Sequence, residues 1–114
     1  MQPRRIRLRH VPVVHDLRYG SDGSRLYLRL DLLDDAKITQ IDLATDKLSV
    51  PLLGNSEVEV ARDKILEIGI PLVTLGAHRG DMVRFQLTLT SDGLPLDIVP
   101  QQGYIEFSTS DPTE

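Results

Sequence analysis

Two glutamates, Glu57 and Glu59, lie close together in the sequence at a spacing that could support glycoside hydrolysis. On a β-strand, residues two apart point to the same side at about 7 Å, a separation that suits the paired carboxyl groups of inverting glycosidases. Such a pair works only in a pocket, with one carboxyl group buried enough to stay protonated. Val58 and Val60 are expected to take the core side, which leaves both glutamates in water. We therefore interpret the pair as a solvated strand face and expect no catalytic residues in this chain.

Aspartates near predicted turns are the candidates for a metal site. Asp22, Asp34 and Asp35, with Asp31 beside them, could offer oxygen ligands to calcium. Their spacing lacks the glycine and the terminal glutamate of an EF-hand loop, and aspartates are common in turns. The three histidines show no zinc-binding spacing, and the chain has no cysteine. We expect no metal and no cofactor, with Asp22, Asp34 and Asp35 as the remaining calcium candidates.

Exposed tyrosines are the side chains that could bind sugar, because the C–H groups of a pyranose pack on a flat aromatic face. The chain has no tryptophan, and both phenylalanines fall on positions expected to face the core. Tyr19, Tyr27 and Tyr104 remain. Tyr27 shares an outward strand face with Arg29 and Asp31, which predicts a sugar platform there. The alternative is a tyrosine that only packs against its cross-strand neighbour.

These side chains need a scaffold, and the alternation of apolar and polar residues predicts one made of β-strands. The alternating segments lie at 26–32, 48–52, 58–60, 66–70, 83–89 and 105–107. One short helical turn is expected at 71–76, where Pro71 opens the turn and Gly76 closes it. We predict an all-β fold, a single antiparallel β-sandwich of about eight or nine strands over residues 1–107, followed by a frayed tail at 108–114.

Composition and charge limit the function classes open to the chain. Its 114 residues provide one core but are too few for a (β/α)8 barrel of about 250 residues. Residues 1–30 contain seven arginines and two aspartates, but the basic residues at 5–9 alternate with apolar ones as in a strand, not as in a disordered nucleic-acid-binding arm. No segment approaches the ~18 apolar residues of a membrane span, and the N-terminus lacks the apolar part of a secretory signal. We expect no nucleic-acid or membrane partner and a cytoplasmic location, with the oligomeric state open.

Two blocks of the sequence resemble a known family. The first, at 19–32, is YGSDGSRLYLRLDL, and the second, at 65–107, is ILEIGIPLVTLGAHRGDMVRFQLTLTSDGLPLDIVPQQGYIEF. Together they are similar to the β-sandwich region at the C-terminal end of glycoside hydrolase family 57, which includes α-amylase-like enzymes and glucanotransferases. More loosely, they look like the sandwiches of carbohydrate-binding module family 9 and of DOMON-type domains.

This resemblance implies a role in carbohydrate metabolism without catalysis. In family 57 the catalytic carboxylates belong to an N-terminal barrel, and nothing in this chain could form that barrel. The first expectation is a non-catalytic accessory domain that supports or positions the catalytic domain of an α-glucan-active enzyme. The alternative is a free-standing module that binds carbohydrate or another small ligand. The partner is then either a catalytic domain or an α-glucan.

Overall fold

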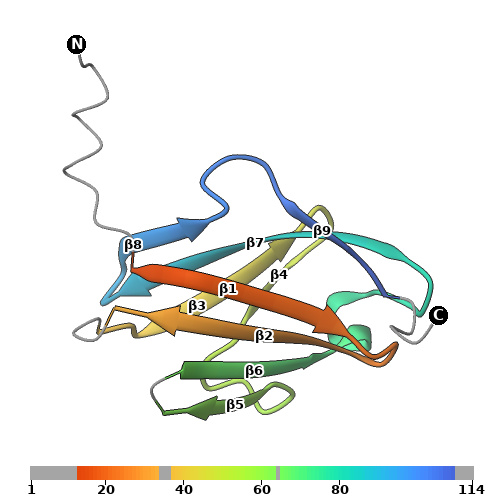
Figure 1. Ribbon diagram of the computed structural model, residues 1–114, viewed down its shortest axis with the longest axis horizontal. Coiled ribbons are helices and arrows are strands. Elements are labelled where there is room, and N and C mark those ends of the chain that lie inside the picture. The colour runs from red at the N-terminus through yellow and green to blue at the C-terminus, as the bar shows by residue number, and fades with distance from the viewer. Residues whose placement is uncertain (1–12, 34–36, 64, 110–114) are drawn as a thin grey trace.

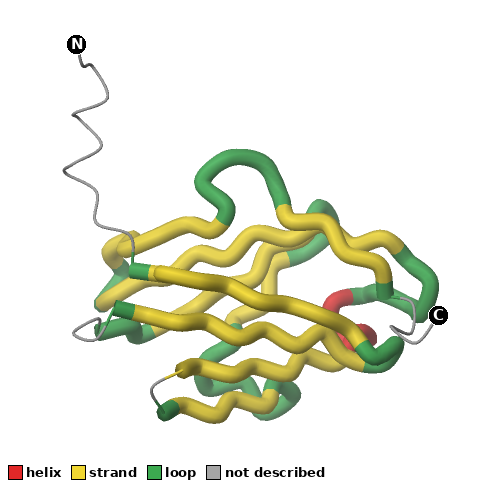
Figure 2. The backbone as a smooth tube through the Cα atoms, in the orientation of Figure 1, coloured by secondary structure: helices red, strands yellow, loops and turns green. Residues whose placement is uncertain are grey.

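Two antiparallel β-sheets make up most of the chain and pack face to face as a sandwich (Figures 1 and 2). The computed structural model describes residues 13–33, 37–63 and 65–109. Nine strands lie within these residues, and the helical element among them is one 3-10 turn. The predicted all-β sandwich is confirmed.

The first sheet has four strands in the order β1-β2-β6-β5. They are β1 (Val14–Ser21), β2 (Arg25–Leu32), β6 (Ile65–Pro71) and β5 (Glu59–Arg62). β1 and β2 form a hairpin, and β2 pairs with all of β6. β2 and β6 are therefore the central strands, and β1 and β5 are the edges.

The second sheet has five strands, in the order β4-β3-β7-β8, with β9 also paired to β7. They are β3 (Gln40–Thr45), β4 (Ser49–Pro51), β7 (Met82–Ser91), β8 (Leu94–Val99) and β9 (Ile105–Ser108). β8 pairs with residues 87–91 of β7 and β9 with residues 82–85, so the two short strands follow one another along the same side of β7.

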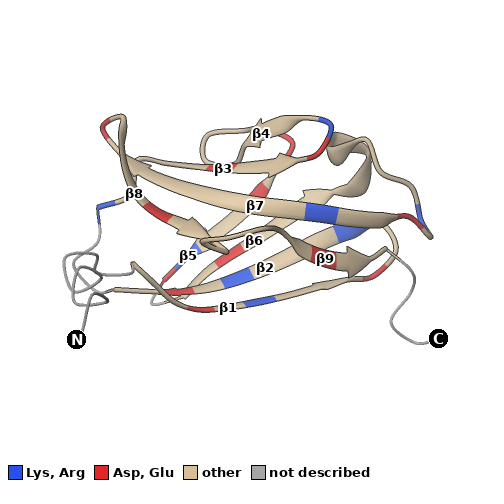
Figure 3. Cartoon of the chain, turned by 90° about the horizontal axis from the view of Figure 1, so that it is seen from above, with Lys and Arg blue, Asp and Glu red and all other residues tan. Residues whose placement is uncertain are grey.

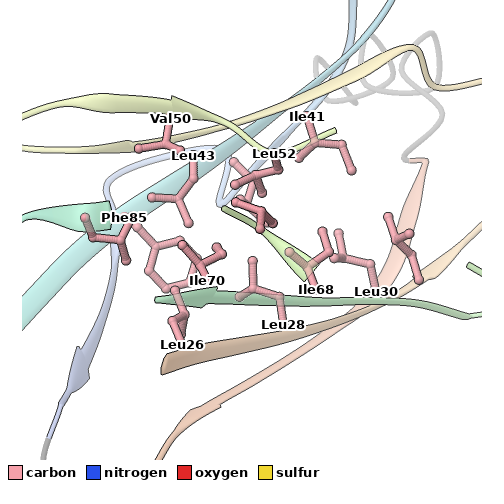
Figure 4. Packing of buried hydrophobic residues seen from close by; sticks show 14 of the residues in the cluster. Leu26, Leu28, Leu30, Ile41, Leu43, Val50, Leu52, Ile68, Ile70 and Phe85 are labelled. Carbon is pink, nitrogen blue, oxygen red and sulfur yellow. The ribbon is translucent and has the colours of Figure 1, made fainter. Parts of the chain in front are cut away.

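Apolar side chains from both sheets meet between the layers and form the core (Figure 4). The alternation predicted along β2 is confirmed, because Leu26, Leu28 and Leu30 are buried while the residues between them are exposed. Strands β3, β6 and β7 bury Ile41, Leu43, Leu66, Ile68, Ile70, Val83, Phe85, Leu87 and Leu89 in the same way. A register slip of one residue would turn the leucines of β2 to the solvent, so burial fixes which face of each strand is outside.

The predicted helical turn is present as η2 (Leu72–Leu75), between β6 and β7. Gly76 ends it with a φ of 69°, a left-handed conformation that glycine adopts without steric cost. The Gly76 N–H donates to the carbonyl oxygen of Val73 at 3.0 Å. Leu72 and Leu75 are buried, so their side chains pack the turn onto the core.

The alternation expected at 57–60 is confirmed at Val58, which is buried in the core, and is wrong at Val60. Glu57 lies in the turn before β5, and Val60 is 40% exposed instead of facing the core. β5 is an edge strand paired only with β6, and all four of its residues are exposed. An edge position leaves an apolar side chain with fewer neighbours than the alternation alone suggests. Glu57 and Glu59 therefore do not form a pair on one strand.

The predicted frayed tail at 108–114 begins too early. Ser108 is the last residue of β9, and Thr109 is fully buried. The Thr109 N–H donates to the carbonyl oxygen of Asp81 at 2.9 Å, and its hydroxyl lies 2.7 Å from the carbonyl oxygen of His78. Residues 110–114, like residues 1–12 with their predicted basic strand, lie outside the described residues.

Candidate ligand-binding groove

The outer face of the four-stranded sheet carries a groove beside Tyr27. The groove is open to solvent and has a volume of about 690 Å³. Small-molecule sites commonly have volumes of roughly 300–1,000 Å³, so one or two sugar rings fit this space. Its lining includes Arg18, Tyr27, Arg29, Glu59 and Glu67, from all four strands of the sheet.

The ring of Tyr27 lies between two glycines. Tyr27 is directly opposite Gly20 of β1 and Gly69 of β6. A Cβ atom at Gly69 would lie 3.5 Å from Cε1 of Tyr27, so the ring rests against the bare backbone of β6. Because both residues directly opposite Tyr27 are glycines, neither neighbouring strand places a side chain directly beside the ring. Tyr27 is therefore 43% exposed although β2 is a central strand. An aromatic surface is therefore open to a ligand.

The hydroxyl of Tyr27 is held by Asp22, in the turn between β1 and β2. It donates to Oδ2 of Asp22 at 3.1 Å, while Oδ1 accepts the backbone N–H groups of Ser24 at 2.9 Å and Arg25 at 3.0 Å. These backbone bonds, with Ser24 first, lower the pKa of Asp22 from 3.8 to about 2. The bond to Asp22 in turn raises the pKa of Tyr27 above its usual 10. At neutral pH the tyrosine thus donates to a carboxylate, which orients the ring.

Charged residues of both signs lie along the strands of this sheet (Figure 3), and four of them line the groove. Arg18 and Arg29 lie on β1 and β2, and Glu67 and Glu59 lie on β6 and β5. Nε of Arg29 is 4.0 Å from Oε2 of Glu67, and Glu59 forms an ion pair with Arg25. The groove therefore offers both hydrogen-bond donors and acceptors close to Tyr27.

The three residues predicted as a platform on β2 do share one exposed face. Tyr27 and Arg29 both line the groove. Asp31 lies farther along β2, opposite Asp16, and borders a smaller hollow of about 150 Å³ that Arg29 also lines. Two of the three predicted residues, Tyr27 and Arg29, therefore line the groove, and Asp31 lies next to it.

The other two predicted tyrosines do not join this face. Tyr19 is directly opposite the buried Leu28, and its ring meets Phe85 edge-on with centroids 6.0 Å apart. Tyr19 borders the groove, but its ring turns toward the inner side of the sheet. Tyr104 lies in the loop that leads into β9, in the five-stranded sheet. Of the three tyrosines predicted as sugar-binding residues, only Tyr27 presents its ring on this outer face.

Of the predicted calcium candidates, only Asp22 lies among the described residues. Both carboxylate oxygens of Asp22 already accept hydrogen bonds from the turn and from Tyr27. Asp34 and Asp35 lie outside the described residues. Among residues 13–33, 37–63 and 65–109, no three His, Asp or Glu side chains are grouped so that they could hold a metal ion.

Sequence analysis missed the residues that shape the groove around Tyr27. Arg18 and Gly20 could have been found, because a hairpin turn at 21–24 pairs Gly20 with Tyr27 and Arg18 with Arg29. Glu67 and Gly69 had no such signal, because β6 follows β2 by more than thirty positions and becomes its neighbour only in the folded sheet.

Comparison of the chain with protein-family models, with curated proteins and with solved structures found no match. The resemblance to the family 57 sandwich region therefore rests on the two sequence blocks quoted for it. No helix in the described part of the chain is long and apolar enough to cross a membrane.

Proposed function

We propose that this chain is a non-catalytic β-sandwich module that binds carbohydrate in the groove beside Tyr27. The observation that carries the proposal is the exposed ring seated between Gly20 and Gly69, which leaves its surface open. The apolar face of a pyranose packs on such a ring, and its hydroxyls need donors and acceptors at the rim. Arg18 and Arg29 supply donors there.

Preorganisation of the ring supports the same function. The bond from the Tyr27 hydroxyl to Asp22 and the contact with Gly69 restrain the side chain before any ligand arrives. A side chain that is already ordered loses less conformational entropy when it binds. A tyrosine restrained in this way is better suited to a sugar platform than one that moves freely on the surface.

Binding explains the surface better than packing against a catalytic domain alone. A docking surface needs a contiguous apolar patch of several hundred Å². In the described part of the chain, the most exposed aliphatic side chains away from the groove belong to three different elements: Val73 on η2, Met82 on β7 and Leu94 on β8. We also propose that the module is an accessory domain of a family 57-like enzyme and lies beside the catalytic domain of that enzyme. The cytoplasmic location stays a prediction.

The proposal contains no catalytic step. The acidic side chains of the groove, Glu59 and Glu67, are 71% and 61% exposed. A glycosidase acid must stay protonated near neutral pH, which requires burial or a close negative neighbour. Glu59 instead faces the positive charge of Arg25.

Titration of the ¹⁵N-labelled chain with maltoheptaose, followed by amide NMR, tests the proposal. We expect saturable shifts that cluster on residues 18–20, 27–29 and 67–69 of the outer face. Tyr27→Ala should abolish them. Tyr104→Ala is the matched control, because it removes a tyrosine of similar exposure from the loop that leads into β9, away from the groove.

A second titration with xylohexaose and cellohexaose covers β-linked sugars. The proposal is abandoned if none of these sugars, nor an acidic oligosaccharide, shifts the outer-face amides at millimolar concentration. It is also abandoned if the shifts survive in Tyr27→Ala.

A further inference from the structure

Two arginines face each other across β1 and β2 beside the Tyr27 ring. Arg18 and Arg29 are directly opposite in the hairpin, so both side chains lie on the outer face. Both line the groove. Like charges at directly opposite positions of a sheet destabilise it, although Arg29 is also directly opposite Glu67 on β6.

Each arginine uses only part of its hydrogen-bonding capacity. Nε of Arg18 donates to Oδ2 of Asp16 at 3.1 Å, and Nε of Arg29 lies 4.0 Å from Oε2 of Glu67. Among the described residues, no hydrogen bond is formed by the terminal amino groups of either guanidinium group. Both side chains are more than half exposed. Two guanidinium groups thus present unused N–H donors side by side at the groove.

The acidic residues nearby define which part of the groove can take an anion. Asp16 and Asp31 lie beyond the arginine pair, away from the ring, and Glu59 and Glu67 lie on the β5 and β6 side. Because acids flank the pair on both sides, the protein exerts little net attraction on a distant anion. Recognition must therefore come from short, directional hydrogen bonds, the strongest of which join guanidinium to carboxylate.

We propose that Arg18 and Arg29 form a carboxylate-binding subsite, and that the ligand of this groove is an acidic sugar, a uronic acid in an oligosaccharide. Tyr27 is two positions from Arg29 on the same face of β2, about 7 Å along the strand. A uronic acid ring packed on Tyr27 then directs its carboxylate toward the arginine pair. The inference rests on the proposed carbohydrate-binding function and narrows its ligand class.

Trigalacturonic acid and its methyl ester give a matched test of this inference. The two ligands have the same rings, but the ester lacks the carboxylate charges. Isothermal titration calorimetry or amide NMR should show that the acid binds at least about tenfold more tightly than the ester, the range expected for charge-assisted hydrogen bonds. Higher salt should weaken binding of the acid and leave binding of the ester unchanged.

Three variants test which arginines cause the preference for the acid over the ester. Arg29→Gln and Arg18→Gln should each weaken binding of the acid about tenfold more than they weaken binding of the ester, which loses only neutral hydrogen bonds to its hydroxyls. Arg84→Gln is the control, because it removes the same charge from β7 on the other sheet, where Arg84 pairs with Glu106 at 2.9 Å. Thermal melts of all variants establish that they remain folded.

The outcomes separate this inference from the proposed function. Equal binding of acid and ester, or tighter binding of maltoheptaose than of the acid, overturns the carboxylate subsite and leaves the carbohydrate module in place. Loss of acid binding in Arg84→Gln to the same extent also overturns it, because the effect would then be one of net charge. Absence of binding by every sugar ends both proposals.

Discussion

The Oδ2 atom of Asp97, in β8, accepts a hydrogen bond from the backbone N–H of Val13, with 2.8 Å between the oxygen and the nitrogen. The same oxygen accepts the N–H of Val14 at 3.0 Å. Asp97 is buried in the five-stranded sheet, whereas Val14 begins β1 of the four-stranded sheet. A side-chain carboxylate thus joins the two sheets at an edge where no strand pairing connects them.

Loss of this carboxylate should destabilise the sandwich strongly. Asp97→Ala leaves the backbone N–H groups of Val13, Val14 and Ile98 without this acceptor. Charge-assisted bonds of this kind contribute about 1.5–3 kcal/mol each. We expect the free energy of unfolding in urea to fall by about 2–4 kcal/mol. Asp46→Ala, at an exposed turn position, is the control and should change it by less than about 0.5 kcal/mol. Similar losses in the two variants would show that Asp97 does not join the sheets.

Gly69 should tolerate alanine but not a larger side chain. A Cβ atom there meets Tyr27 and Glu59 at 3.5 Å, which is ordinary van der Waals contact, and Gly69 is not among the glycines with positive φ. Gly69→Ala is therefore expected to keep the stability within about 1 kcal/mol. Gly69→Leu should displace the ring, which aromatic NMR signals of Tyr27 would report together with weaker ligand binding. If the Tyr27 ring does not move in Gly69→Leu, the contact that we describe between the ring and Gly69 is wrong.

The turn that holds Tyr27 should lose stability in acid. The folded pKa of Asp22 is about 2 against an ordinary 3.8, so its contribution is complete above about pH 4 and disappears as the pH falls toward 2. Asp22→Asn should remove this part of the pH dependence. Chemical shifts of the Asp22 carboxyl carbon give the pKa directly, and a midpoint near 4 would refute the expectation.

Tyr27 should ionise at a pH above the ordinary tyrosine value of 10.0. Its hydrogen bond to the Asp22 carboxylate raises its pKa, so this contribution is present below pH 10 and disappears as the pH rises through the folded value. Ultraviolet titration near 295 nm should show a late phase that is absent in Tyr27→Phe. In Asp22→Asn the same phase should move to lower pH, and an unchanged phase would exclude Asp22 as the cause.

Several elements could be predicted because their signal is local. The strict alternation of β2, the same pattern in β7, and the turn from Pro71 to Gly76 each depend on residues that are close in sequence. Strands β1, β3 and β8 were missed as distinct elements. β1 lacks a regular burial pattern because it is an edge strand. β8 buries Asp97 while Leu94 and Ile98 are exposed, so apolar alternation does not mark it. β3 does bury Ile41 and Leu43 in alternation, and that signal was overlooked.

The sequence by itself determined the fold class and which face of β2 points outward, because a period of two and the need to bury leucine leave one solution. That was sufficient to place Tyr27, Arg29 and Asp31 on the surface. Only the tertiary structure decided that β6 lies beside β2, which brings Gly69 under the ring and Glu67 beside Arg29. The physical reason is that strand pairing over more than thirty positions depends on how the whole core packs, and no short stretch of sequence encodes that choice.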